Sequence, residues 1–169
     1  MSVSASARDH RPALRRDAIA LAASFGLVVL VAGLGSGVTG TGPGTWYASL
    51  EKPAWTPPGA FIGIVWTFLY ALMAVAAWLV WRTRDPRRAL ALGLYGAQLA
   101  LNAAWSWLFF GLERPWLAFA DIALLAALVL ATLVAFARVS RVAAALLAPY
   151  LAWVFVAGTL NLLIALANP

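Results

Sequence analysis

The sequence predicts an all-α membrane protein built as a bundle of five transmembrane helices, and three observations support this fold class. Of the 169 residues, 64% are hydrophobic and 11% are charged, whereas a soluble domain is closer to half apolar and a quarter charged. Five apolar runs approach or exceed the roughly 20 residues that cross a bilayer as a helix. Most Lys and Arg residues fall on one side of the topology that five spans produce, as is usual for multi-pass membrane proteins.

Helix start and stop signals set the boundaries of the five spans. Thr56-Pro57 and Asp85-Pro86 each place a capping side chain before a Pro at the first helical position. Gly111 ends the third run, the ERP sequence after it starts the fourth, and Ser140 can cap the fifth. The predicted spans are about 18–38, 61–81, 89–111, 116–137 and 142–167, and residues 39–60 form a long first loop.

The basic residues predict the orientation of the bundle. Ten of the twelve Lys and Arg residues lie in the N-terminal segment and in the second and fourth connections, and only Lys52 and Arg114 lie on the other side. The N-terminus is therefore expected in the cytoplasm, and the first loop and the C-terminus outside. Residues 1–17 are predicted to be a basic cytoplasmic tail, either an interfacial helix on anionic lipid or a disordered segment, and residues 18–169 the transmembrane domain. Because topology accounts for the Arg residues, the net charge of +6 is no reason to expect nucleic acid as a partner.

Residue content excludes several classes of chemistry. The chain has no Cys, and its one His, His10, lies in the N-terminal segment, so we expect neither thiolate catalysis nor a metal site. The sequence offers no Ser/His/Asp set and no phosphate-binding loop, so no catalytic residue and no cofactor is assigned. Asp121 is the only carboxylate within an apolar run. Either it has a function, or it stays near the headgroups or is held by an N–H or hydroxyl of a neighbouring helix.

The first loop is unusually aromatic for a connection between membrane helices. Residues 46–61 read WYASLEKPAWTPPGAF, with two Trp, one Tyr, one Phe and three Pro. This composition argues against disorder, and long loops in compact folds are usually functional. We therefore expect the loop to cover a site.

Aromatic and polar side chains form stripes on three of the spans, because residues three or four apart share one helix face. Buried amides can simply join helices, and Trp can belong to the interfacial belt. Their convergence on interior faces favours a pocket for a flat, mostly apolar ligand with a few polar edges. The stripes are Trp66, Tyr70 and Met73 on the second span; Tyr95, Gln98, Asn102, Trp105 and Phe109 on the third; and Tyr150, Trp153, Ala157 and Asn161 on the fifth.

Five short motifs follow one another along the chain: WYASLEKPAWTPP, IVWTFLY, YGAQLALNAAW with FFG, PYLAW and TLN. Together they resemble the TspO/MBR family, the tryptophan-rich sensory proteins related to the mitochondrial translocator protein, or peripheral benzodiazepine receptor. The resemblance implies a five-helix bundle whose first loop closes over a cavity. It also implies that the protein is a homodimer and that it lies in a bacterial cell membrane. Members bind porphyrins such as protoporphyrin IX, and isoquinoline or benzodiazepine drugs. The proposed sterol motif of animal members is missing here, because TLN is followed by LLIALANP, without Tyr or a basic residue.

The resemblance implies a receptor- or sensor-type membrane protein that binds porphyrin or another planar apolar ligand, with links to tetrapyrrole handling and stress response. Two alternatives stay open. One is a light-dependent porphyrin-degrading enzyme, in which Trp66 and Trp153 would act on the bound porphyrin. The other is a transporter of porphyrin or lipid-like molecules, although the chain shows no repeat and no mid-span acid. The motifs carry over Tyr47, Trp55, Trp66, Asn102, Trp105, Trp153 and Ala157 as ligand-binding residues, and the stripes add Tyr70 and Phe109.

Overall fold

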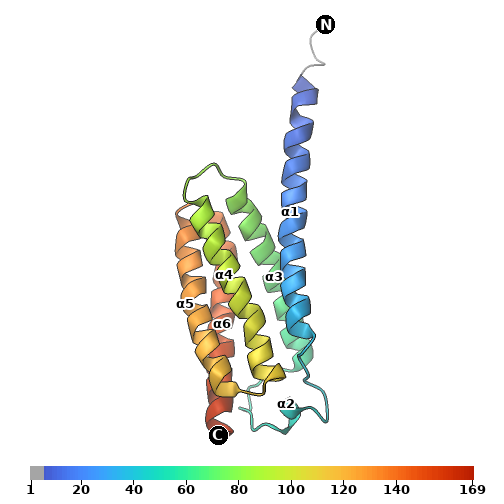
Figure 1. The fold of residues 1–169 in the computed structure, drawn as a ribbon, viewed down its shortest axis with the longest axis vertical. Helices are drawn as coiled ribbons and strands as arrows, with labels where there is room; N and C mark the ends of the chain where they lie inside the picture. Colours follow the sequence, from blue (N-terminus) through green and yellow to red (C-terminus); the bar gives the residue numbers. More distant parts are fainter. Residues whose placement is uncertain (1–5) are drawn as a thin grey trace.

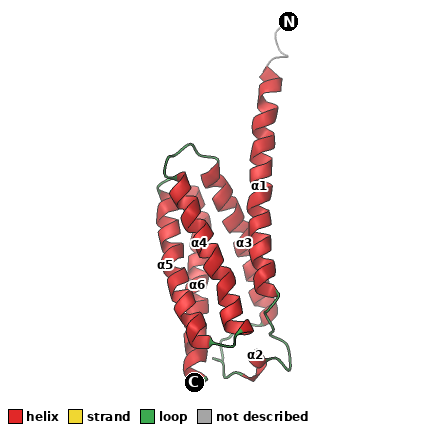
Figure 2. Ribbon diagram, in the orientation of Figure 1, coloured by secondary structure: helices red, strands yellow, loops and turns green. Residues whose placement is uncertain are grey.

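The computed structural model describes residues 6–169, with side chains from Leu14 onward, and this part of the chain is helical without a strand (Figures 1 and 2). Five long helices stand side by side, and one short helix lies in the loop after the first. The helices are α1 (Ser6–Ser36), α2 (Trp46–Ser49), α3 (Gly59–Trp81), α4 (Arg88–Ser106), α5 (Pro115–Ala137) and α6 (Arg141–Ala167), with a π-helical turn at Trp107–Gly111 directly after α4.

The chain is an integral, multi-pass membrane protein. Four segments are long and apolar enough to span a bilayer, namely Leu14–Ser36 of α1 and the whole of α3, α5 and α6. α4 is shorter, at 19 residues, and is less apolar because its buried face carries Gln98 and Asn102. Side by side, α1 packs on α3 and α4, α3 also packs on α6, and α5 packs between α4 and α6. The five long helices therefore form a closed ring around one interior.

α1 is longer than the predicted first span. It runs as one helix from Ser6, through most of the segment predicted as a tail, and projects beyond the other helices (Figure 1); residues 1–5 lie outside the described residues. Two contacts fasten it to α3 where the bundle begins. Arg82 Nε lies 3.0 Å from Asp17 Oδ2, and Trp78 Nε1 donates to the carbonyl oxygen of Asp17 at 3.1 Å.

The predicted helix starts have different outcomes. Ser140 caps α6 as predicted, since its Oγ accepts from the backbone N–H of Ala143 at 3.3 Å. The prediction for Asp85-Pro86 is wrong, because α4 begins only at Arg88 and neither residue is its N-cap or its first residue. Asp85 instead accepts from the backbone N–H of Arg87 at 2.8 Å in the turn before α4, and its bonds to Arg87 lower the pKa of the Asp85 carboxyl to about 2. The prediction for Thr56 is also wrong. α3 begins only at Gly59, and the Thr56 hydroxyl donates to the carbonyl of Pro53 at 2.7 Å instead.

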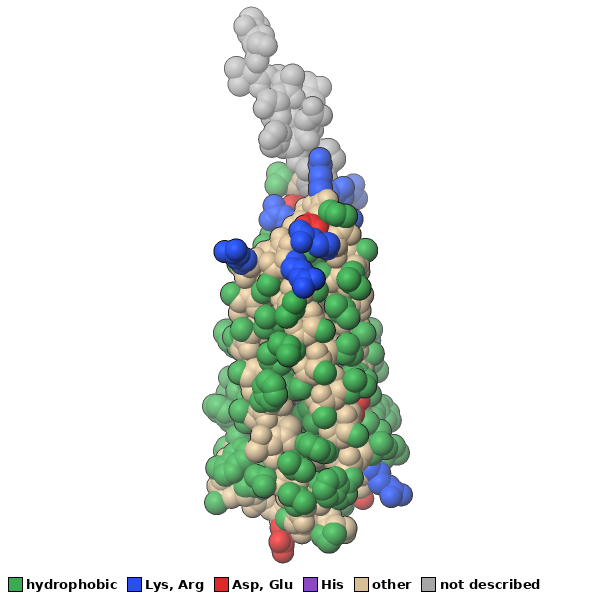
Figure 3. All heavy atoms as spheres, turned by 90° about the vertical axis from the view of Figure 1, so that its left-hand side faces the viewer, with side chains coloured by type: hydrophobic (Ala, Val, Ile, Leu, Met, Phe, Trp, Pro, Cys, Tyr) green, Lys and Arg blue, Asp and Glu red, His purple; other side chains and the backbone are tan. Residues whose placement is uncertain are grey.

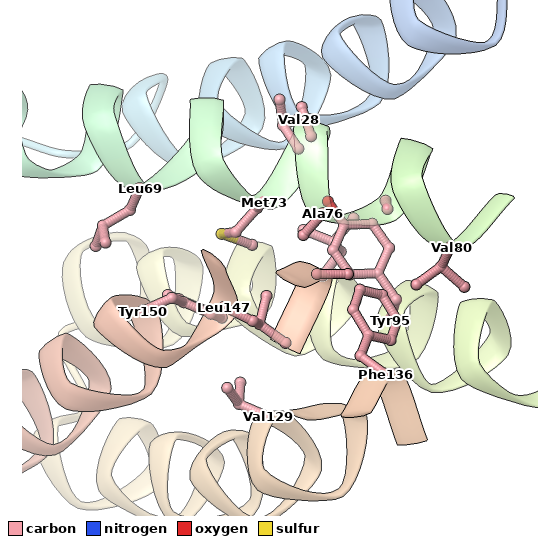
Figure 4. Packing of buried hydrophobic residues seen from close by; sticks show 14 of the residues in the cluster. Val28, Leu69, Met73, Ala76, Val80, Tyr95, Val129, Phe136, Leu147 and Tyr150 are labelled. Atoms are coloured by element: carbon pink, nitrogen blue, oxygen red, sulfur yellow. The ribbon is translucent and has the colours of Figure 1, made fainter. Parts of the chain in front are cut away.

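The larger core cluster fills the bundle from its middle to one end, and a smaller cluster of Phe109, Ala118 and Ile164 lies near the other end. We call the end that carries Arg82, Arg88 and Arg138 the basic end, and the end that carries residues 37–58 the lid end; basic side chains gather at the former in Figure 3. The buried residues of α3 begin at Leu69 and continue to Val80, toward the basic end. Figure 4 shows this packing, which includes the stacked rings of Tyr95 and Phe136, 5.9 Å apart. The first ten residues of α3 include no buried side chain, so interior space remains at the lid end.

Candidate functional site

A cavity of about 540 Å³ lies inside the lid end of the bundle. Its walls come from α1, α3, α4, the π turn, α5 and α6, and its roof comes from the first loop. The residues that line it are mostly apolar, and none of them is charged. Its size falls within the range of pockets that enclose drug-sized ligands, and such pockets are mostly apolar with a few placed polar groups.

The structure brings together eight of the nine residues predicted to bind ligand. The exception is Trp55, which is 49% exposed on the loop and does not line the cavity. Its indole instead suits the interfacial belt of Trp side chains that flank membrane spans. The eight that line the cavity are Tyr47, Trp66, Tyr70, Asn102, Trp105, Phe109, Trp153 and Ala157.

A hydrogen-bonded group at Asn102 forms the floor of the cavity. Asn102 Oδ1 accepts from the Tyr70 hydroxyl at 2.7 Å, and Asn102 Nδ2 donates to the Tyr150 hydroxyl oxygen at 3.1 Å. The group therefore joins α3, α4 and α6. The ring of Trp66 rests on the two tyrosine rings, with centroid distances of 5.2 and 6.0 Å. Both ends of the Asn102 amide thus have protein partners, so this side chain shapes the floor more than it offers free polar atoms.

A second amide braces the wall of the cavity. Trp105 Nε1 donates to Asn161 Oδ1 at 2.9 Å, and Asn161 Nδ2 donates to the carbonyl of Pro115 at 2.9 Å. This bridge connects α4 with α6 and with the first residue of α5. The two predicted roles of the amides therefore coincide, since Asn102 and Asn161 hold helices together and also line the cavity. Gln98, although on the same stripe, is fully buried outside the lining and has no hydrogen-bond partner within the described residues.

The indole N–H of Trp153 is one of several polar groups of lining residues without a hydrogen-bond partner in the described part of the chain, beside the hydroxyls of Thr41, Tyr47 and Ser106. The Nε1 atom is buried, has no hydrogen-bond partner in the described part of the chain, and belongs to a residue that lines the cavity. A buried donor without a partner is costly, by about 1–3 kcal/mol. An acceptor atom, such as a carbonyl oxygen or a ring nitrogen, would satisfy this N–H if the Trp153 ring turned it toward the cavity.

An aromatic cluster forms the roof. Phe109 stacks on Trp105 with a centroid distance of 5.1 Å, and Trp46 and Tyr47 of the loop pack on it at 5.5 and 6.2 Å. Tyr47 also contacts the ring of Phe110 at 5.5 Å. Burial under this cluster raises the pKa of the Tyr47 hydroxyl above its usual value of 10.0.

The π turn explains why two consecutive Phe residues line the cavity. Its hydrogen bond from Leu112 N to the carbonyl of Trp107, 2.8 Å long, spans five residues instead of four. The turn is therefore wider, and Phe109 and Phe110 both line the cavity, which a regular α-helix with 3.6 residues per turn disfavours. The places of Phe110 and Trp46 at the roof and of Tyr150 in the floor were not predicted from the sequence. The FFG motif was visible, but helical periodicity gave no sign of a π turn.

Asp121 does not take part in the cavity. Its Oδ2 atom is buried on α5 and has no hydrogen-bond partner among the described residues. The expectation that a neighbouring N–H or hydroxyl holds this carboxyl is therefore not met for the part of the chain that the structure describes. The neighbouring Ile122 does line the cavity, so Asp121 lies beside the site without facing it.

Comparison with known proteins identifies one family. The model of the TspO/MBR family matches residues 24–166. The Translocator protein of Homo sapiens is 43% identical over 119 residues, which cover 69% of this chain and 70% of that protein. The Tryptophan-rich protein TspO of Chlorobaculum tepidum is 38% identical over 158 residues, which cover 92% of this chain and all of that protein. The Tryptophan-rich sensory protein of Cereibacter sphaeroides is 40% identical over 119 residues, which cover 70% of this chain and 74% of that protein.

Proposed function

The chain belongs to the TspO/MBR family, and on this basis we propose that it is a receptor- or sensor-type membrane protein that binds a porphyrin or a similar planar apolar molecule in the cavity beneath its first loop. One observation carries the proposal: a cavity of about 540 Å³, without charged residues, contains eight aromatic, amide or small residues that the family motifs and stripes single out. Binding would link the protein to tetrapyrrole handling and stress response.

The cavity supports binding chiefly by apolar burial and ring stacking. Trp66 and Trp105, which line the cavity and are only partly buried, would offer ring faces or edges to a planar ligand, and such contacts add to the gain from burying apolar area. The Trp153 N–H would orient the ligand by donating to an acceptor on its edge. Because charges inside a membrane are expensive and the lining contains no charged partner, the carboxylates of a porphyrin would stay at the rim near the first loop.

We further propose that α4 crosses the bilayer as the third of five spans. Together with the π turn it covers residues 88–111 and closes the ring between α1 and α5. Its amides face the interior, where Asn102 has protein partners. Five spans put the two termini on opposite sides, with the basic end and the N-terminus in the cytoplasm. We also propose that the protein forms a homodimer and lies in a bacterial cell membrane.

The binding proposal is tested by titrating the detergent-solubilised protein with protoporphyrin IX in the dark and following the quenching of Trp fluorescence. We expect saturable binding in the micromolar range, weakened several-fold by Trp153→Phe, which removes the free N–H but keeps an aromatic ring. Trp116→Phe is the matched control, because Trp116 is exposed and lies outside the cavity. Quenching that rises linearly and is equal in all three proteins would mean partition into detergent and would refute the proposal.

Light-dependent porphyrin breakdown remains a second candidate function, because Trp66 and Trp153 both line the cavity and a bound photosensitiser would contact both. The test is illumination of the protein saturated with protoporphyrin IX. Absorbance changes that need the protein and disappear in Trp66→Phe or Trp153→Phe at saturating porphyrin would support an enzyme. Equal changes in the variants and in wild type would leave binding as the function. The transporter alternative is tested by measuring porphyrin flux across sealed vesicles that contain the protein. Flux that needs the protein would support it.

A further inference from the structure

Asn168, just after α6, holds the first loop through its side-chain amide. Asn168 Oδ1 accepts from the backbone N–H of Glu51 at 3.0 Å, and Asn168 Nδ2 donates to the backbone carbonyl of Glu51 at 3.0 Å. Nδ2 also donates to the carbonyl of Ile164 at 2.8 Å. The amide therefore holds one loop residue by both of its main-chain groups while remaining anchored to α6. We call this arrangement the Asn168 clip.

Among the residues that the structure describes, the clip is the one hydrogen-bonded connection between the loop and a distant part of the chain. Within the described residues, every other hydrogen bond made by residues 40–57 stays inside that segment. The loop's other contacts with the helices include the ring contacts of Trp46 and Tyr47 with Phe109 and Phe110 and the packing of Leu50 on the cluster of Phe109, Ala118 and Ile164. Apolar contacts are non-directional and allow sliding. The clip therefore fixes the position of Glu51 relative to the end of α6.

A short series of contacts links Glu51 to Tyr47 at the roof of the cavity. The next residue, Lys52, donates from Nζ to the carbonyls of Tyr47 at 2.6 Å and Leu50 at 2.7 Å. Its ammonium also lies 4.9 Å from the centre of the Tyr47 ring. Residues 47–52 are therefore tied into one compact turn, and Tyr47 is the member of that turn that lines the cavity. Displacing Glu51 would displace Tyr47 with it.

We propose that Asn168 is a positioning residue that sets how often the roof of the ligand cavity opens. The inference rests on the proposed function, because the roof controls traffic only if the cavity takes a ligand. Asn168 itself does not line the cavity. It therefore acts on the rate at which a planar apolar ligand passes the roof, and the contacts of the bound ligand stay the same with or without the clip.

This role has a kinetic signature. If the loop is mostly closed with and without ligand, loosening the clip raises the open population in both states. The association and dissociation rate constants for protoporphyrin IX then rise by the same factor, and Kd stays constant. A residue that contacts the ligand would change the dissociation rate constant and Kd together.

The test compares Asn168→Leu, which keeps the size of the side chain but removes the clip, with wild type in stopped-flow Trp quenching. We expect both rate constants to rise by roughly three- to tenfold, the effect of losing one or two exposed hydrogen bonds. Glu51→Pro removes the N–H from the other partner, and Leu50 before it already has the extended ψ of 145° that a residue preceding Pro requires. Combined with Asn168→Leu it should add little, because both changes remove the same bond.

Thr159→Val is the matched control. The Thr159 hydroxyl on α6 donates to the carbonyl four residues earlier, at 2.9 Å, as Asn168 does to Ile164, but within the described residues this hydroxyl has no hydrogen bond to the loop. Both rate constants should stay at the wild-type values in this variant. Unchanged rate constants in Asn168→Leu, or a faster dissociation matched by a proportional rise in Kd, would overturn the proposal.

A measurement without ligand separates this inference from the proposed function. In hydrogen–deuterium exchange, residues 46–52 should exchange faster in Asn168→Leu than in wild type or Thr159→Val, because the loop opens more often. If no protein binds porphyrin saturably but exchange still accelerates, the proposed function fails and the clip stands. If exchange is equal in all three proteins, the clip does not hold the loop, whatever the binding result.

Discussion

Replacement of Asn102 by Leu removes the hydrogen bonds at the floor of the cavity while keeping the size of the side chain. In the native protein the Asn102 amide satisfies the hydroxyls of Tyr70 and Tyr150, at 2.7 and 3.1 Å. Tyr150 is fully buried and Asn102 is only 5% exposed, so water cannot easily take over these bonds. The variant therefore leaves two tyrosine hydroxyls without a partner in the interior of the bundle.

The expected loss of stability follows from the number of bonds and the membrane setting. Each interhelical hydrogen bond in a membrane protein contributes about 0.6 kcal/mol on average and up to about 1.7 kcal/mol. Two bonds therefore correspond to roughly 1–3 kcal/mol. Because Trp66 rests on both tyrosine rings, we also expect protoporphyrin IX to bind more weakly as the floor loosens.

The assay is reversible unfolding in mixed micelles, followed by circular dichroism, with porphyrin titration alongside. The triple variant Asn102→Leu, Tyr70→Phe, Tyr150→Phe is the informative comparison, since removing both partners of a hydrogen bond can be nearly neutral. It should recover most of the stability that the single variant loses. The reasoning is refuted if Asn102→Leu is as stable as wild type, or if the triple variant is no more stable than the single one.

Three further predictions concern the roof, the cavity volume and the basic end. Tyr47→Ala should raise the Kd for protoporphyrin IX at least several-fold in a quenching titration, whereas Trp55→Ala, outside the cavity, should change it by less than about twofold. Ala157→Leu should fill part of the cavity, weakening binding without lowering the melting temperature, and a melting temperature well below wild type would contradict this. Asp85→Asn should melt earlier than wild type at pH 7. Since the pKa of Asp85 is lowered from 3.8 to about 2, the stabilisation is present above pH 4 and is lost as pH falls through 2, where the two melting temperatures should converge.

The membrane class and most helix boundaries could be predicted from the sequence, because hydropathy and capping signals are local properties. Ser140 illustrates this, since a Ser before an apolar run has few other roles and caps α6 as expected. Thr56 illustrates the limit. Its neighbour Pro57 suits a first helical position, but a second Pro follows, and the helix starts only at Gly59 while the Thr56 hydroxyl closes a turn inside the loop. With two consecutive Pro residues the helix could begin at either of them or just after, and local capping rules do not decide among these positions.

Most of the residues that the sequence predicts as ligand-binding line the cavity, but the sequence does not predict the hydrogen bonds that they make. Helical spacing placed Asn102, Trp105 and Asn161 on interior faces, and all three line the cavity. Which atoms remain free for a ligand depends on partners on other helices, such as the carbonyl of Pro115, and no periodicity within one helix reveals them. The same holds for the Asn168 clip, whose two residues are 117 positions apart in the chain.

If the cavity binds a planar ligand as proposed, the two amides that the sequence singles out contribute few free polar atoms to its selectivity. The amides of Asn102 and Asn161 and the indole N–H of Trp105 are committed to helix bridges. The Trp153 N–H lacks a partner in the described structure, and it can only donate. A ligand whose buried edge presents an acceptor would satisfy this N–H, whereas one that presents a donor there would leave two donors unpaired, at a cost of about 1–3 kcal/mol each. Planar ligands that differ only in an acceptor or a donor at one edge should therefore differ in affinity by at least tenfold in wild type and by much less in Trp153→Phe.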